Sequence, residues 1–167
     1  PSGSGKTTTL DLFCGLREET KSHWNVQTNY HNYNFLGSSG ARQIRNLISY
    51  APQNAVLFEA SLRHNLFVGS GDETSKLYHW MHKLRLKHLL SRDTGLDTPL
   101  KLAEDPFSGG EIQRLGLLRA WLRDQPIEVL DEPTAFLDDD TAEIVRTIIL
   151  ERVKQKLVLV STHDPLL

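Results

Sequence analysis

The sequence predicts an α/β protein whose largely parallel sheet is covered by helices on both faces. Short apolar segments typical of strands lie at residues 47–51, 127–130 and 157–161, and segments of helical periodicity separate them. Strands that alternate with helices favour a parallel sheet. A chain of 167 residues with 39% hydrophobic residues can bury about two-thirds of its unfolded surface, so we expect one globular domain.

The first half of the chain contains a helix, two weak strands and one buried strand. A Gly- and Ser-rich loop runs into a helix up to residue 16, with apolar residues at helical spacing. Aromatic residues among polar ones suggest short half-buried strands within residues 21–36, followed by a turn at 37–40 and a short helix at 41–45. The strand at 47–51 must stop before Pro52, because a proline restricts the backbone conformation of the residue before it.

The second half begins with a helical insert and then returns to alternating elements. Residues 61–90 carry helical periodicity that is interrupted at 69–71. A long helix is predicted at 108–123, and a further helix at 141–154 separates the last two strands.

Composition and charge exclude several classes of protein. The formal net charge is −2, from 19 basic and 21 acidic residues, and no basic run offers a surface for nucleic acid. Apolar runs fall far short of the roughly 20 residues that cross a bilayer. The single Cys14 cannot form an internal disulfide and fits a reducing compartment. Because the chain opens on Pro1 without a Met, we expect it to be part of a longer protein.

The chain opens with the end of a phosphate-binding loop, Ser2-Gly3-Ser4-Gly5-Lys6-Thr7. Gly3 and Gly5 let backbone N–H groups turn inward around phosphates. Lys6 supplies a charge to the β and γ phosphates, and the Thr7 hydroxyl is placed to ligate Mg²⁺. The helix that follows points its positive end at the same anion. The first glycine of this pattern, and the strand that precedes such a loop, would lie before Pro1.

An apolar strand at residues 127–130 ends in two carboxylates, Asp131 and Glu132. The carboxyl ends of parallel strands form the edge where α/β proteins bind ligands. We expect Asp131 to hold Mg²⁺ through water and Glu132 to orient and polarise the attacking water, as phosphoryl transfer requires. Glu128 does not fit this pattern, because a charge within a buried strand needs a partner or an exposed face.

A third motif, Phe107-Ser108-Gly109-Gly110-Glu111-Ile112-Gln113-Arg114, lies between the other two. With the three motifs in this order, the chain resembles the ATP-binding cassette (ABC) ATPases over nearly its whole length. The resemblance implies a P-loop NTPase fold with a mainly parallel sheet, an inserted helical (signature) subdomain and a remnant of the antiparallel β-subdomain. The core would comprise residues 1–53 and 124–167, and the helical signature subdomain with its return helix residues 54–123.

The resemblance implies that the ligands are ATP and Mg²⁺. It assigns catalysis to Glu132, Gln53 and His163, and Mg²⁺ binding to Thr7, Gln53 and Asp131. It assigns nucleotide binding to the phosphate loop, the signature segment and one further acid: Ser2, Gly3, Ser4, Gly5, Lys6, Thr7, Thr8, Ser108, Gly109, Gly110, Glu111 and Asp138. Of these, Asp138 would contact the other subunit. Taken singly, Gln53 could equally be a solvated loop residue, Asp138 a helix cap and His163 a surface histidine.

Residues 54–66 and 95–98 resemble segments of exporter-type ABC proteins. The resemblance therefore implies an ATPase that dimerises head to tail around ATP and powers export at the cytoplasmic face of a membrane. Its partners would be a second ABC ATPase domain, identical or homologous, and a transmembrane domain, fused N-terminally in the parent protein, with no nucleic acid. The alternatives are a soluble ABC ATPase that clamps nucleic acid or ribosomes, an importer ATPase subunit, and a partner that binds nucleotide with little hydrolysis.

Several residues depart from the family pattern or suggest other chemistry. Ile112 stands where a basic residue is usual, and residues 103–106 lack the glycines found before the exporter signature. The aromatic residue that stacks on adenine would precede Pro1. His79, His82 and His88 lack neighbouring cysteines and carboxylates at ligand spacing, so we do not expect a zinc site. The three tryptophans are expected to be packing residues.

Overall fold

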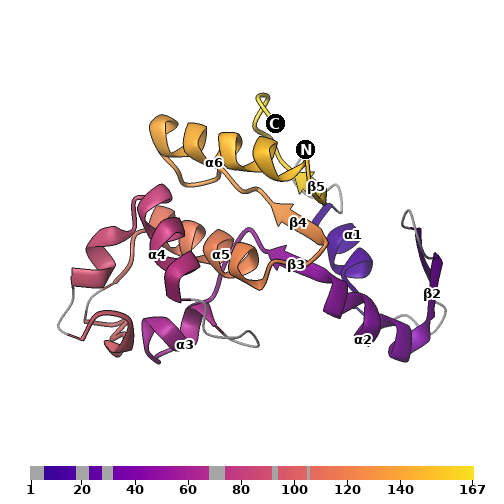
Figure 1. Ribbon diagram of the computed structural model, residues 1–167, viewed down its shortest axis with the longest axis horizontal. Helices are drawn as coiled ribbons and strands as arrows, with labels where there is room; N and C mark the ends of the chain where they lie inside the picture. The colour runs from indigo at the N-terminus through magenta and orange to yellow at the C-terminus, as the bar shows by residue number, and fades with distance from the viewer. Residues whose placement is uncertain (1–5, 18–22, 28–31, 68–73, 92–93, 105) are drawn as a thin grey trace.

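The centre of the molecule is a three-stranded parallel sheet. The computed structural model describes residues 6–17, 23–27, 32–67, 74–91, 94–104 and 106–167. The strands β3 (Ile48–Ala51), β4 (Ile127–Asp131) and β5 (Leu157–Ser161) lie in the order β3-β4-β5 (Figure 1). Parallel pairing aligns Ala51 of β3 and Val160 of β5 with Leu130 of β4, so the carboxyl ends of all three strands meet at one edge.

Helices cover both faces of the central strand β4. Ile127 and Val129 pack in one core with helices α1 (Lys6–Phe13) and α2 (Gly37–Leu47). Leu130 faces the opposite side and packs with α5 (Gly109–Arg123) and α6 (Asp139–Arg152). The alternation follows from the two-residue period of a strand. The predicted parallel sheet between helices is therefore confirmed at β4.

The strand β5 is less well covered than the sequence predicts. Leu157 and Leu159 are 60% and 38% exposed. Within the described part of the chain β5 pairs with β4 alone, so it is an edge strand of this sheet.

The first sheet element of the chain is a separate antiparallel ribbon. It consists of β1 (His23–Gln27) and β2 (Asn32–Leu36), with Trp24 opposite Phe35. Both side chains are buried, and the Trp24 indole N–H donates to the Phe13 carbonyl at 3.0 Å. This ribbon is where the sequence predicts short half-buried strands.

The predicted turn at residues 37–40 is wrong, because helix α2 begins at Gly37, directly after β2. Gly37 has a φ of +56°, which reverses the chain within one residue. Gly40 then lies against β2: a Cβ there would be 2.6 Å from the carbonyl carbon of Phe35. The small residues serve a close contact between helix and strand, and the short helix predicted at 41–45 is the middle of α2.

The helical insert consists of α3 (Leu62–Leu66), α4 (Thr74–Lys83), the 3₁₀ turns η1 (Lys87–Ser91) and η2 (Gly95–Asp97), and α5. These elements lie together on the left of Figure 1, beside the sheet. They share one apolar core with Leu130 of the sheet and with α6. The predicted break at residues 69–71 lies outside the described residues.

Glu128, which departs from the apolar pattern of its strand, is fully buried and paired. The Arg152 Nε donates to both carboxylate oxygens of Glu128, at 2.9 and 2.7 Å, and its Nη2 donates to Oε1. The Arg152 guanidinium also lies 5.5 Å from the Trp80 ring and 5.8 Å from the Trp121 ring. The partner that the sequence required for this charge is therefore the last residue of α6.

The described part of the chain holds no helix with the length and apolar character needed to cross a membrane.

Candidate functional site

The acidic pair lies at the carboxyl edge of the sheet, as the strand pattern predicts. Asp131 is the last residue of β4 and is 2% exposed. Glu132 follows with a φ of +48°, an uncommon conformation for a residue with a side chain. Its N–H donates to the Ser161 carbonyl at 2.7 Å, and its carbonyl accepts from the Gln113 amide nitrogen at 3.1 Å. These bonds from β5 and α5 hold the turn that aims the Glu132 side chain.

The start of α1 lies directly against these carboxylates. The Thr7 hydroxyl donates to Asp131 Oδ2 at 2.9 Å, and Lys6 Nζ donates to Glu132 Oε1 at 3.2 Å. Asp131 reaches Thr7 because it points to the same side of β4 as Val129, the side that α1 covers. The phosphate-loop lysine and the strand-end carboxylates therefore form one cluster, from opposite ends of the sequence.

His163 completes this cluster from the loop after β5. Its Nε2 lies 2.8 Å from Lys6 Nζ and 3.6 Å from Glu132 Oε1. Its backbone N–H donates to Glu132 Oε2 at 3.0 Å. Glu132 thus accepts from a side chain through one oxygen and from the backbone through the other. Lys6, Glu132 and His163 contact one another, and the bonded pair of Thr7 and Asp131 adjoins them in the sequence.

The donors at this edge fit Mg²⁺. The Thr7 hydroxyl and the Asp131 carboxylate are hard oxygen ligands, which Mg²⁺ prefers, and they already touch. The described residues contain no group of three or more His, Cys, Asp and Glu placed to hold a metal. A site with few protein ligands suits Mg²⁺, since this ion keeps waters and phosphate oxygens in its shell.

Two further predicted site residues, Gln53 and Thr8, lie within the described part of the chain. Gln53 is half-buried and lies two residues beyond the end of β3, at the edge from which Asp131 emerges. Thr8 lies on the exposed side of α1. The expected phosphate-loop residues Ser2, Gly3, Ser4 and Gly5 lie outside the described residues.

The signature segment forms the N-terminus of α5. The Ser108 hydroxyl accepts from the Glu111 N–H at 3.2 Å, and Glu111 Oε2 accepts from the Ser108 N–H at 2.9 Å, which makes a reciprocal capping box. A Cβ on Gly110 would lie 3.0 Å from the Phe136 carbonyl oxygen. Ser108 and Gly109 are exposed at this N-terminus, and the positive end of the helix dipole there favours an anion.

The Glu111 carboxyl is also held by His88, a residue that sequence reasoning set aside. His88 Nε2 lies 2.7 Å from Glu111 Oε1. Partial burial raises the pKa of Glu111, but the hydrogen bonds from Ser108 and His88 outweigh burial and hold that pKa below its ordinary value. The capping carboxylate therefore stays ionised at neutral pH.

Asp138 is the N-cap of α6. It accepts from the Thr141 N–H at 2.9 Å and from the Thr141 hydroxyl at 2.8 Å, and these bonds lower its pKa. Its neighbour Phe136 is 64% exposed and has a φ of +63°. Because Asp138 caps the helix, α6 begins at Asp139, two residues before the predicted start.

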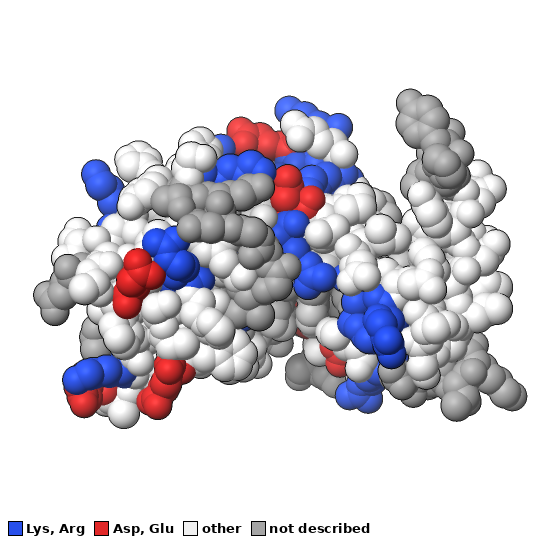
Figure 2. Space-filling view, turned by 60° about the horizontal axis from the view of Figure 1, so that its bottom comes forward, with Lys and Arg blue, Asp and Glu red and all other residues white. Residues whose placement is uncertain are grey.

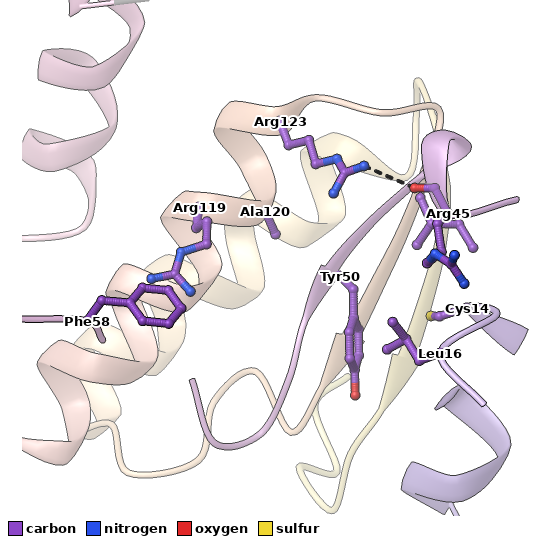
Figure 3. A pocket seen from close by; sticks show the side chains of 9 residues that line it. Cys14, Leu16, Arg45, Tyr50, Phe58, Arg119, Ala120 and Arg123 are labelled. Atoms are coloured by element: carbon purple, nitrogen blue, oxygen red, sulfur yellow. Dashed lines mark hydrogen bonds between the residues drawn. The ribbon is translucent and has the colours of Figure 1, made fainter. Parts of the chain in front are cut away.

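A pocket of about 320 Å³ lies away from the phosphate cluster (Figure 3). Its floor combines Leu16, Tyr50 and Phe58, and three arginines stand around it: Arg45, Arg119 and Arg123. Figure 2 shows Lys and Arg side chains gathered beside the hollow near the middle of the face drawn there.

The guanidinium groups of this pocket are bound to backbone oxygens. Arg119 donates to the Asn65 carbonyl at 2.7 Å and lies 5.9 Å from the Phe58 ring, and burial lowers its pKa. Arg123 donates to the Arg45 carbonyl at 3.1 Å. Phe58 is 50% exposed. No sequence motif marks this pocket, since its residues come from four separate stretches of the chain.

Comparison with known proteins places these motifs in a family. The family model of the ABC transporter matches residues 1–135. The chain is 37% identical, over 77% of its length, to the glutathione/L-cysteine transport system ATP-binding/permease protein CydC of Escherichia coli (strain K12), of which it covers 22%. It is 31% identical, over 98% of its length, to the beta-(1-->2)glucan export ATP-binding/permease protein NdvA of Brucella suis biovar 1, of which it covers 27%.

The fold matches that of a solved exporter. A bacterial Atm1-family ABC exporter with ATP bound superposes with a TM-score of 0.75 at 20% identity, over 98% of this chain and 28% of that chain. The present chain thus spans between 22% and 28% of the length of the proteins named here.

Proposed function

This chain belongs to the ABC transporter family, and on that premise we propose that it binds and hydrolyses ATP to drive export across a membrane. The observation that carries the proposal is a set of contacts from three segments of the chain: Lys6 with Glu132 and His163, and the neighbouring pair of Thr7 and Asp131. The names of the relatives, which combine ATP-binding with permease or export, support the transport part.

The residues of the cluster suit phosphoryl transfer to water. Lys6 would bind the β and γ phosphates, and Thr7 and Asp131 would hold Mg²⁺, which neutralises charge on the phosphates when bound. Glu132 would orient the attacking water and accept its proton, since it is 13% exposed and fixed at both backbone ends. The His163 side chain would hydrogen-bond the γ phosphate. The backbone N–H of the same residue donates to Glu132 and so ties its loop to the carboxylate.

A second copy of the domain, or a homologous one, would complete each site. The N-terminus of α5 at Ser108, Gly109 and Gly110 is exposed and suited to an anion, yet no contact joins it to Lys6 within the described residues. We assign it to the nucleotide on the partner domain, with Asp138 and Phe136 at the same interface. The arrangement divides the chain into a core of residues 1–53 and 124–167 and a helical part of residues 54–123.

The transmembrane partner would dock at the pocket between α2, β3 and α5. The pocket includes Phe58, which is 50% exposed, and three arginines. Val56, whose carbonyl accepts from Arg119 Nη2, is 62% exposed. Exposed apolar groups with a polar rim mark protein interaction sites. The domain would then work on the cytoplasmic side of the membrane, where ATP is available.

Substitution of Glu132 tests the proposal in the full-length parent protein. Glu132→Gln should bind ATP and lose about 10²- to 10³-fold in turnover, because it removes the group that takes the proton from water. The matched control is Glu151→Gln, the same change at an exposed residue of α6. Turnover of Glu132→Gln equal to that of the control would contradict the mechanism, and absence of hydrolysis by the unsubstituted protein would contradict the function.

A further inference from the structure

Asp164, the residue after His163, gathers hydrogen bonds from three segments of the chain. Its Oδ2 accepts from the Thr134 hydroxyl at 3.0 Å and from Arg146 Nη1 at 2.8 Å, and its Oδ1 accepts from the Leu166 N–H at 3.0 Å. The Asp164 and Arg146 side chains are 11% and 13% exposed. The bonds from Leu166, Arg146 and Thr134 lower the pKa of Asp164, so its carboxylate is ionised at neutral pH.

His163 depends on its backbone for its position. Its side chain is 61% exposed, so packing fixes the imidazole ring little. Its N–H donates to Glu132, and the next N–H, of Asp164, donates to the Thr162 hydroxyl at 2.9 Å. The bonds of the Asp164 carboxylate are therefore the firmest anchor of the loop in the described structure, because they include an ion pair with a largely buried guanidinium.

The two side chains that bind Asp164, Thr134 and Arg146, both belong to the segment that follows β4. Thr134 lies two residues after Glu132, in the turn closed by the bond from the Ala135 N–H to the Glu132 carbonyl. Arg146 lies on α6, whose cap is Asp138. One carboxylate thus joins the loop of His163 to the turn of Glu132 and to the helix that begins at Asp138.

We propose that Asp164 is a positioning residue for His163: with Thr134 and Arg146 it holds the His163 loop in register with Glu132. This inference rests on the proposed ATPase function and assigns roles to three residues that are not among the predicted site residues. Asp164 itself does not touch the cluster of Lys6 and Glu132 in the described contacts, so it acts through the loop. Loss of the anchor should lower kcat for ATP hydrolysis and leave the affinity for ATP nearly unchanged.

Thr134 offers a matched pair of variants. Thr134→Val removes the hydroxyl and keeps the shape, whereas Thr134→Ser keeps the hydroxyl that donates to Asp164. In the full-length parent protein we expect Thr134→Val to lower kcat about 10-fold with KM for ATP within about twofold, because small displacements of catalytic groups are costly. Thr134→Ser should keep kcat within about twofold of the unsubstituted protein.

A double substitution separates this anchor from general damage to the fold. Asp164→Ala should lower kcat at least as much as Thr134→Val, and adding Thr134→Val to it should change kcat by less than about twofold, since both remove the same bond. Additive losses, or equal kcat for Thr134→Val and Thr134→Ser, would overturn the proposal.

Amide hydrogen exchange tests the same anchor without turnover. In Asp164→Ala the amide of His163 should exchange at least about 10-fold faster, while the amides of β4 keep their protection. Unchanged exchange at His163 would overturn the inference whatever the kinetics show. If the unsubstituted protein hydrolyses no ATP, the proposed function fails, and the exchange measurement still decides whether Asp164 holds the loop.

Discussion

Replacing Arg152 by methionine removes the guanidinium that binds the buried Glu128 carboxylate. Arg152 makes three hydrogen bonds to Glu128, and Lys156 Nζ, at 3.6 Å, is the other cation near this carboxylate in the described structure. Burial lowers the pKa of Arg152, but the bonds to Glu128 outweigh burial and raise it, so the guanidinium is charged. Methionine has a similar length and leaves the stacking against Trp80 and Trp121 as an apolar contact.

The expected loss of stability follows from the burial of Glu128, which is 0% exposed. Removing one member of a buried ion pair costs about 3–5 kcal/mol, because the remaining charge loses its hydrogen-bonded partner, and Lys156 at 3.6 Å compensates Glu128 only in part. Replacing both members by apolar residues of similar volume is neutral or stabilising by about 1–4 kcal/mol. Glu128→Leu combined with Arg152→Met should therefore recover most of what Arg152→Met loses.

Native-state hydrogen exchange of the β4 amides measures this effect in the intact protein. A loss of 3–5 kcal/mol corresponds to exchange faster by about two to four powers of ten. The control is Lys101→Met, which breaks an ion pair with Glu104 in which both side chains are more than two-thirds exposed, and which should shift exchange by less than about fivefold. Equal effects of Arg152→Met and the control, or a double variant weaker than Arg152→Met, would refute the reasoning.

Three further predictions concern a close contact, a thiol and the site itself. A Cβ on Gly116 would lie 2.6 Å from the Ala55 Cβ, so Gly116→Ala should destabilise by about 1–3 kcal/mol and Ala55→Gly should reverse most of the loss, as measured by urea unfolding. Burial, and secondarily Asp11, raises the pKa of Cys14 from 9.0 to about 12, so the folded protein should resist iodoacetamide at pH 8.5 and react once unfolded. The stability linked to this thiol is present below pH 9 and lost between pH 9 and 12, because the unfolded thiol ionises first. Glu132→Gln should tighten ATP binding about two- to fivefold in the absence of Mg²⁺, because it releases Lys6 from an ion pair, and an unchanged Kd would contradict this.

The sequence predicted the strands of the parallel sheet well, because strands depend on local patterns. Apolar runs of four or five residues located β3, β4 and β5 to within one residue. The Ser108 and Asp138 segments lie at helix starts, where short polar side chains cap free N–H groups. The error at residues 37–40 arose from Gly and Ser, which signal a turn in the sequence but here allow helix α2 to approach Phe35.

The contacts that tie distant segments together could not be predicted. Asp164 follows His163 in the sequence, yet its partners Thr134 and Arg146 are 30 and 18 residues away, and no pattern in the sequence pairs them with it. The same holds for Gln113, which lies in the signature segment and bonds to the Glu132 carbonyl. A polar residue shows its chemistry in the sequence, but its partner is chosen by the packing of helices against the sheet.

The buried pair of Glu128 and Arg152 has a consequence for the register of the central strand. Side chains of β4 alternate between its two faces, so Glu128 points to α6 while Asp131 points to Thr7 on α1. A slip of one residue would move Glu128 into the apolar core beside Leu10 and turn Asp131 away from Thr7. Such a slip would separate the buried Glu128 carboxylate from Arg152, whereas an apolar residue at position 128 could pack on either face of the sheet. The ion pair therefore favours the one register in which the carboxylates of β4 reach the phosphate loop, which is the use best attested for buried charges.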